Sequence, residues 1–137
     1  MRISPSTLLL QQPYALLADA ARNIGDPQIR NRGTIAGSLV HADPAADYPS
    51  AVIALDGRLV IAKADGSTRT VSADDFLAGP LMIDIAEDEL VTQIIIPTPA
   101  PSSGGAYDKH SQVAGDFAII RWLCRLRSTP LGRAYRR

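Results

Sequence analysis

The sequence of 137 residues lacks several features that would assign it to a class at once. Its single cysteine, Cys124, excludes an internal disulfide and a zinc site built from several cysteines, and it fits a reducing compartment. No apolar run approaches the length of a membrane span, and the three leucines at 8–10 are too few for a signal-peptide core. We therefore expect a cytoplasmic protein without a membrane partner.

Net charge is also absent, because 14 basic and 14 acidic residues cancel. No global field therefore favours nucleic acid or a membrane surface. The charges are unevenly placed, since every acidic residue precedes residue 121, whereas 121–137 carries six arginines. This segment is interpreted as a solvated basic tail, with a nucleic-acid-binding arm as the alternative. No basic motif precedes it, so we expect no nucleic-acid partner.

What the sequence does contain is apolar residues in sufficient number for one folded domain, 46% against 20% charged. Apolar residues at three- and four-residue spacing predict a helix over 13–24. Pro13 suits its first turn and Gly25 is placed to end it. The stretch that follows, up to residue 33, is expected to be a polar connection.

A second helix is predicted before residue 56, ending at Leu55. Its start is left open between two positions. Asp43 would cap a helix that begins at Pro44, and Asp47 would cap one that begins closer to Pro49.

The rest of the chain has the pattern of β-strands joined by turns. Asp65 and Gly66 predict a tight hairpin turn, and Ser72 with Asp75 resembles a capping box that starts a short helix. Strands are expected at 58–63, 67–72, 89–97, 106–111 and 116–123. The predicted fold class is therefore α+β, with helices packed on a mainly antiparallel sheet.

The most unusual stretch is IRNRGTIAGSLVHADPAADYP, residues 29–49, in which Gly33 and Gly37 bracket three residues. Small side chains leave the backbone of 33–38 uncovered, so consecutive N–H groups can point into one concavity and attract an anion. An arginine stands on each side of Asn31. No lysine follows the second glycine, and the spacing differs from the dinucleotide fingerprint. A phosphate-binding turn and a plain tight turn both stay open.

Acidic residues follow that stretch closely. Asp43 and Asp47 are helix caps in one interpretation and functional groups in another. A metal site formed with His41 is conceivable, although the other histidine, His110, is distant in the sequence. No serine lies in a nucleophile-elbow pattern and Cys124 has no activating neighbour. We assign no catalytic residue and no metal ligand, so any catalysis would depend on a cofactor.

Three blocks carry a resemblance to a known family: IRNRGTIAGSLVHADPAADYPSAVIALDG, DELVTQIIIP and YDKHSQVAGDFA. In this order they resemble the FAD-binding medium subunit of molybdenum hydroxylases, that is, the flavoprotein of carbon monoxide dehydrogenase and the flavin domain of xanthine dehydrogenase. The resemblance implies the second subdomain of an FAD-binding PCMH-type fold. It also implies FAD as the cofactor.

The resemblance assigns a set of cofactor-binding residues. In the family, a Thr-Ile-Gly-Gly turn surrounds the FAD pyrophosphate, and the corresponding residues are Thr34, Ile35, Ala36 and Gly37, with Gly33 and Ser38 beside them. Asp47 matches the family acid near the flavin, and Lys109 lies in the Tyr-x-Lys segment.

The resemblance further implies an electron-relay function. Such subunits pass electrons from iron–sulfur clusters through FAD to an acceptor, beside a large molybdopterin-binding subunit and a small iron–sulfur subunit. The chain is interpreted as a truncated member that is inactive alone. Its expected parts are a non-family leader (1–12), a partial FAD-binding subdomain (13–100), the start of a C-terminal subdomain (101–120) and the basic tail (121–137), with a frameshift near residue 120 as a hypothesis. The alternative is a non-catalytic remnant that folds without holding FAD.

Overall fold

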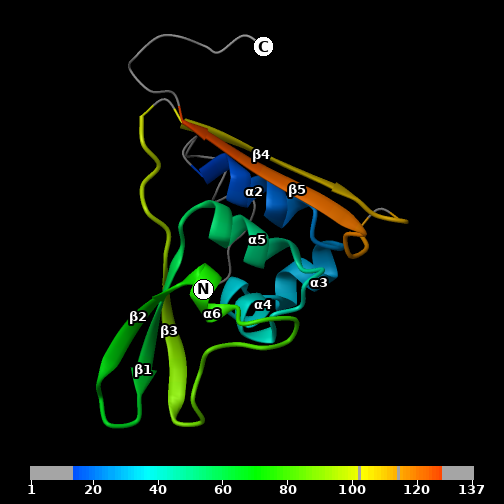
Figure 1. Cartoon of the computed structure of the whole chain (residues 1–137). Helices are drawn as coiled ribbons and strands as arrows, with labels where there is room; N and C mark the ends of the chain where they lie inside the picture. The colour runs from blue at the N-terminus through cyan, green and yellow to red at the C-terminus, as the bar shows by residue number, and fades with distance from the viewer. Residues whose placement is uncertain (1–13, 102, 114, 128–137) are drawn as a thin grey trace.

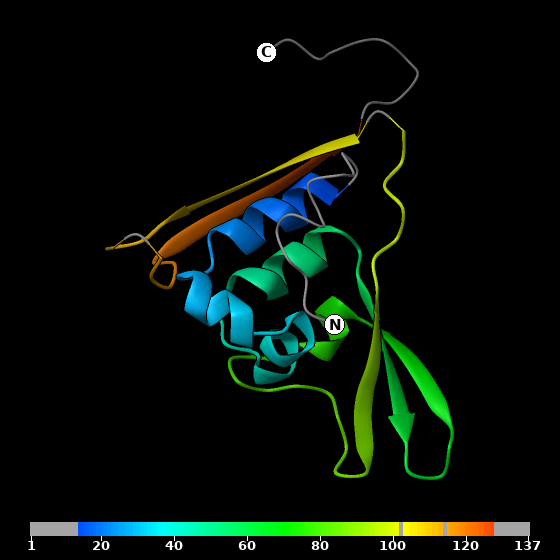
Figure 2. The same ribbon diagram turned by 180° about the vertical axis from the view of Figure 1, so that it is seen from behind.

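The computed structural model describes residues 14–101, 103–113 and 115–127. Within them, two antiparallel sheets lie at opposite ends of a layer of five helices (Figures 1 and 2). The helices are α2 (Ala15–Arg22), α3 (Pro27–Arg32), α4 (Ile35–His41), α5 (Asp47–Ala54) and α6 (Ala73–Phe76). The strands are β1 (Arg58–Lys63), β2 (Thr68–Ser72), β3 (Glu89–Ile95), β4 (Ser103–His110) and β5 (Ile120–Arg127). The α+β class is confirmed, and no described helix has the length and apolar character needed to cross a membrane.

Two of these helices, α3 and α4, fall where a polar connection and a turn were predicted, so both of those predictions are wrong. Asp26 caps α3 by accepting a hydrogen bond from the Ile29 N–H at 2.9 Å, and Pro27 occupies the first helical position. Thr34 caps α4 in the same way. With 6 and 7 residues, these helices are too short to show an apolar period, and their capping residues are the local signal.

The two predicted helices are present with different boundaries. Helix α2 covers the middle of the predicted 13–24, and Pro13 lies outside the described residues. Helix α5 begins at Asp47 without a side-chain cap, so neither proposed capping aspartate caps it. Asp43 instead accepts the Ala45 N–H at 2.8 Å in a local turn, directly after Ala42 has reversed the chain with a φ of 51°.

The first sheet has strand order β2-β1-β3 and packs against α4 and α6. The predicted hairpin between β1 and β2 is confirmed, since Gly66 has a φ of 85° and Asp65 accepts the Ser67 N–H at 2.8 Å. The predicted capping interaction is confirmed as well. Ser72 Oγ accepts the Asp75 N–H at 3.1 Å at the start of α6.

The second sheet is the antiparallel pair β4 and β5, which covers α2 and α5 (Figure 1). Strand β5 continues to Arg127, so the first part of 121–137 is not a solvated tail. Arg121 Nε donates to Ser50 Oγ at 2.6 Å, and Arg125 pairs with Asp56 at 2.6 Å. These arginines join the sheet to the region of α5. The rest of that segment, 128–137, and the predicted leader lie outside the described residues.

One apolar core joins the helical layer to both sheets. Its largest fully buried side chains are Phe76, Leu39, Leu59, Ile61 and Val52. Tyr107 from β4 belongs to the same core cluster, so the second sheet shares its packing. The core thereby sets the position of the helical layer, on which the candidate site lies.

Gly57 provides a test of how tightly α5 packs before β1. A Cβ at this position would lie 2.3 Å from Val52 Cγ1 and 2.8 Å from the Val52 carbonyl oxygen. We predict that Gly57→Ala lowers the free energy of unfolding by about 1–3 kcal/mol, measured by urea denaturation. Gly104→Ala is the control, because a Cβ there meets nothing within 4 Å. Equal stability of the two variants would contradict the packing described.

The ion pair between Glu89 and Arg69 predicts an acid-dependent loss of stability. Hydrogen bonds from Arg69, and then from the Ala86 N–H, lower the pKa of Glu89 from its ordinary 4.5 to about 2. A lowered folded-state pKa stabilises the protein above pH 4.5, and this contribution disappears as the pH falls towards 2. We expect Glu89→Gln to flatten the dependence of unfolding free energy on pH in that window. Glu87→Gln, at an exposed position, should leave the slope unchanged.

Candidate functional site

A cavity of about 460 Å³ opens beside α4 and the start of α5. It is lined by Ile24, Ile29, Arg30, Arg32, Gly33, Thr34, Gly37, Ser38, His41, Asp43, Ala46, Asp47, Tyr48 and Phe117. Five of the predicted cofactor-binding residues are in this set, namely Gly33, Thr34, Gly37, Ser38 and Asp47. The remaining three, Ile35, Ala36 and Lys109, do not line it.

The polar part of the cavity lining is the segment 33–38, which contains the first turn of α4 and not the tight turn expected from the two glycines. Three of its amides are bonded within the protein: Gly33 N–H donates to Ile29 O, Gly37 N–H to Thr34 Oγ1 and Ser38 N–H to Thr34 O, at 2.8–3.1 Å. Among the described residues, the N–H groups of 34–36 have no protein acceptor. A helix start leaves such donors free, and they favour an anion.

The glycines of this turn are explained by the limited space around them and not by an unusual backbone conformation. Neither Gly33, with a φ of −70°, nor Gly37 has a positive φ. A Cβ at Gly37 would lie 2.9 Å from Thr34 Oγ1, the atom that caps the helix. Ala36 is helical, so an alanine there costs no backbone strain. Glycine at 37 therefore keeps the cap and the free amides in place.

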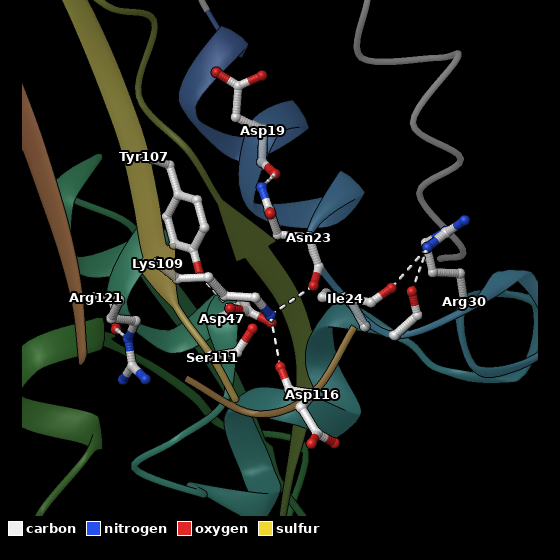
Figure 3. Close-up of polar contacts among 12 residues, drawn as sticks. Asp19, Asn23, Ile24, Arg30, Asp47, Tyr107, Lys109, Ser111, Asp116 and Arg121 are labelled. Carbon is white, nitrogen blue, oxygen red and sulfur yellow. Dashed lines mark hydrogen bonds and ion pairs between the residues drawn. The ribbon is translucent and has the colours of Figure 1, made fainter. Parts of the chain in front are cut away.

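The arginines near the site differ in what they contact. Arg30 lines the cavity, yet its Nη1 donates to the carbonyl oxygens of Ile24 at 2.7 Å and Gly25 at 2.9 Å (Figure 3). Arg32, in the last turn of α3, is exposed and also lines the cavity. Arg30 thus orders the connection after α2, and Arg32 leaves its charge facing solvent at the polar side.

A buried polar cluster lies at the other side of the cavity and joins two predicted site residues. Asp47 accepts hydrogen bonds from the Tyr107 hydroxyl and, at 3.2 Å, from Lys109 Nζ (Figure 3). The Asp47 and Lys109 side chains are 6% and 4% exposed. Burial and the Asp47 contact raise the pKa of Tyr107 above its ordinary value. Tyr107 was not predicted, although it is two residues before Lys109 and so shares its face of the strand.

Lys109 has used all of its hydrogen-bonding capacity. Besides Asp47, its Nζ donates to the carbonyl oxygen of Asn23 at 2.6 Å and to that of Asp116 at 3.0 Å. An ammonium group has three donors and no acceptor. Three separate segments therefore meet at one nitrogen atom, and the predicted contact of Lys109 with a cofactor stays a prediction.

The cavity also has an apolar side, formed by Ile24, Ile29, Tyr48 and Phe117. Burial raises the pKa of Tyr48, so its hydroxyl stays neutral. Phe117 is 64% exposed and comes from the turn between β4 and β5. Neither aromatic residue was predicted from the sequence, because no local pattern indicated that 48 and 117 meet. Within the described stretches, no three His, Cys, Asp or Glu side chains group to hold a metal ion.

Comparison with known proteins identifies a family that matches most of the chain. The family model for the FAD binding domain in molybdopterin dehydrogenase matches residues 3–99, which includes most of the predicted leader. The carbon monoxide dehydrogenase medium chain of Hydrogenophaga pseudoflava is 41% identical over 113 residues, 82% of this chain and 39% of that protein. The nicotine 6-hydroxylase medium subunit of Paenarthrobacter nicotinovorans is 39% identical over 104 residues, 76% of this chain and 36% of that protein.

Solved structures show the same fold. A carbon monoxide dehydrogenase structure from Hydrogenophaga pseudoflava matches with a TM-score of 0.85 at 38% identity, covering 91% of this chain and 43% of that chain. The chain therefore belongs to the family of FAD-binding domains of molybdopterin dehydrogenases, and the resemblance inferred from its sequence is confirmed. It spans about two fifths of the length of these relatives.

The buried pair predicts a strong energetic coupling between Asp47 and Lys109. Lys109→Met leaves a buried carboxylate without its cation, so we expect a loss of about 3–5 kcal/mol in unfolding free energy. Adding Asp47→Asn removes that uncompensated charge, so the double variant should be less destabilised than the sum of the two single ones. Urea denaturation of all four proteins measures this coupling, and strict additivity would contradict a buried pair.

Proposed function

We propose that this chain binds FAD, with the diphosphate at the first turn of α4. The observation that carries the proposal is a set of three amides at 34–36 that have no acceptor among the described residues. They lie beside a cavity and within the segment that the family model matches. Helix starts bind phosphate through such amides. Thr34, Ile35 and Ala36 would supply this contact by their backbone amides, and Gly33, Gly37 and Ser38 would line it.

The two sides of the cavity fit two parts of such a ligand. The polar side, with Arg32 exposed near it, suits the doubly charged diphosphate. The apolar side, with Tyr48 and Phe117, suits an aromatic ring. Asp47 also lines the cavity, and the family resemblance assigns it to the ring end of the cofactor. A flavin dinucleotide has both groups, which inorganic phosphate alone does not.

The proposed role is an electron relay within a larger assembly. Bound FAD would supply the redox chemistry, taking electrons from iron–sulfur clusters and passing them to an acceptor. The chain's own residues bind and orient the cofactor, and none is assigned as an acid or base. The relatives are named as medium chains or subunits, which supports partners that include a molybdopterin-binding large subunit and an iron–sulfur small subunit.

The alternative is a remnant that folds without holding FAD. The observation behind it is that the chain spans about two fifths of the length of these relatives. Titration of the full chain with FAD separates the two functions. Binding quenches flavin fluorescence and shifts the flavin absorbance, and inorganic pyrophosphate should compete. No spectral change at high micromolar FAD would reject the proposal in favour of the remnant.

A substitution at Gly37 tests the site itself. Gly37→Ala places a Cβ 2.9 Å from Thr34 Oγ1 and displaces the cap, which is worth about 0.5–2 kcal/mol. We predict that the Kd for FAD rises about tenfold, as a loss of about 1.4 kcal/mol implies. Gly79→Ala is the matched control, because a Cβ there has only ordinary contacts with Met82. Unchanged FAD affinity in Gly37→Ala would place the diphosphate elsewhere.

A further inference from the structure

Lys109 occupies a place that no local pattern explains, where three segments meet beside the cavity. Its Nζ donates to Asn23 O after α2, to Asp47 Oδ2 at the start of α5 and to Asp116 O in the turn before β5 (Figure 3). The side chain is 4% exposed. All three donors are satisfied, so the ammonium has none left for a ligand.

The three carbonyl oxygens that follow the end of α2 accept hydrogen bonds from cations. Lys109 binds that of Asn23, and Arg30 binds those of Ile24 and Gly25. These carbonyls lie just past the C-terminus of α2, where the helix carries partial negative charge, so two cations are favourably placed there. These hydrogen bonds hold the 23–25 connection in place, and another segment can pack against it.

The turn that carries Phe117 packs on this surface. A Cβ at Gly115 would lie 3.4 Å from the Gly25 carbonyl carbon and oxygen, so the two glycines are in close contact. Gly115 has a φ of 91°, which only glycine adopts without strain. One residue on, the Asp116 carbonyl accepts from Lys109. Phe117 itself is 64% exposed, so core burial does not determine its position.

We propose that Lys109 is a positioning residue, which holds the 115–118 turn against the 23–25 connection and thereby sets the place of Phe117 at the apolar side of the cavity. The effect on ligand binding rests on the proposed FAD function, whereas the placement of the turn by Lys109 does not. Asp47 balances the buried charge, and Tyr107 holds the other carboxylate oxygen. Lys109 thus affects a bound ring through the turn, without touching it.

Hydrogen exchange in the full chain tests the placement without any ligand. The Asp116 N–H donates to Val113 O and the Ile119 N–H to His110 O within this turn. We expect Lys109→Met to speed exchange of these two amides about tenfold more than it speeds exchange of the amides of β1, because the turn also loses a hydrogen bond to a charged group. Gly57→Ala, which destabilises the fold elsewhere, should produce no such selective change. Equal acceleration in β1 and the turn would overturn the proposal.

FAD affinity tests the consequence. Gly115→Ala adds strain at a positive φ and crowds Gly25, but it removes no contact of Lys109. We expect both Gly115→Ala and Lys109→Met to raise the Kd for FAD about tenfold or more. Wild-type affinity in Gly115→Ala would overturn the role of the turn. A wild-type chain that binds no FAD rejects the proposed function, while the exchange measurement still decides the placement.

Discussion

The buried ion pair of Asp47 and Lys109 is the interaction on which the arrangement around the cavity depends. Two charges at 6% and 4% exposure are costly to bury, and they persist because each is fully hydrogen-bonded. The pair links β4 to the first residue of α5, and through Asn23 and Asp116 it reaches two further segments. The second sheet is thereby placed over the helical layer by directional contacts as well as by packing.

The residues of the site differ in whether their hydrogen-bond donors are free or already used within the protein. Within 33–38, three amides have no acceptor in the part of the chain that the structure describes. All three donors of Lys109 are used within the protein. We therefore propose that the residues matched to the family motifs include some that contact a ligand and one, Lys109, that holds a backbone segment in place. The distinction follows from the count of donors rather than from distance to the cavity.

Local structure was predicted well where one short stretch carries the whole signal. The Asp65–Gly66 turn and the Ser72 cap depend on neighbours within three residues, and both are present. Helices α3 and α4 were missed although Asp26 and Thr34 were visible, because the two glycines and the polar residues favoured a turn. The strand at 120–127 extends into the basic segment because β4 pairs with it and α5 covers it, which no local pattern indicates.

The sequence by itself determined the family, the α+β class and the stretch for which we propose an anion site, because these depend on ordered motifs and on residues adjacent in the chain. The tertiary structure decided that the stretch is a helix start, that Asp47 and Lys109 pair across 62 residues, and that Tyr48 and Phe117 share one cavity. Long-range pairs of this kind form only when the core brings the segments together and excludes water. Buried polar groups need partners, and which residues are buried together cannot be seen from one sequence.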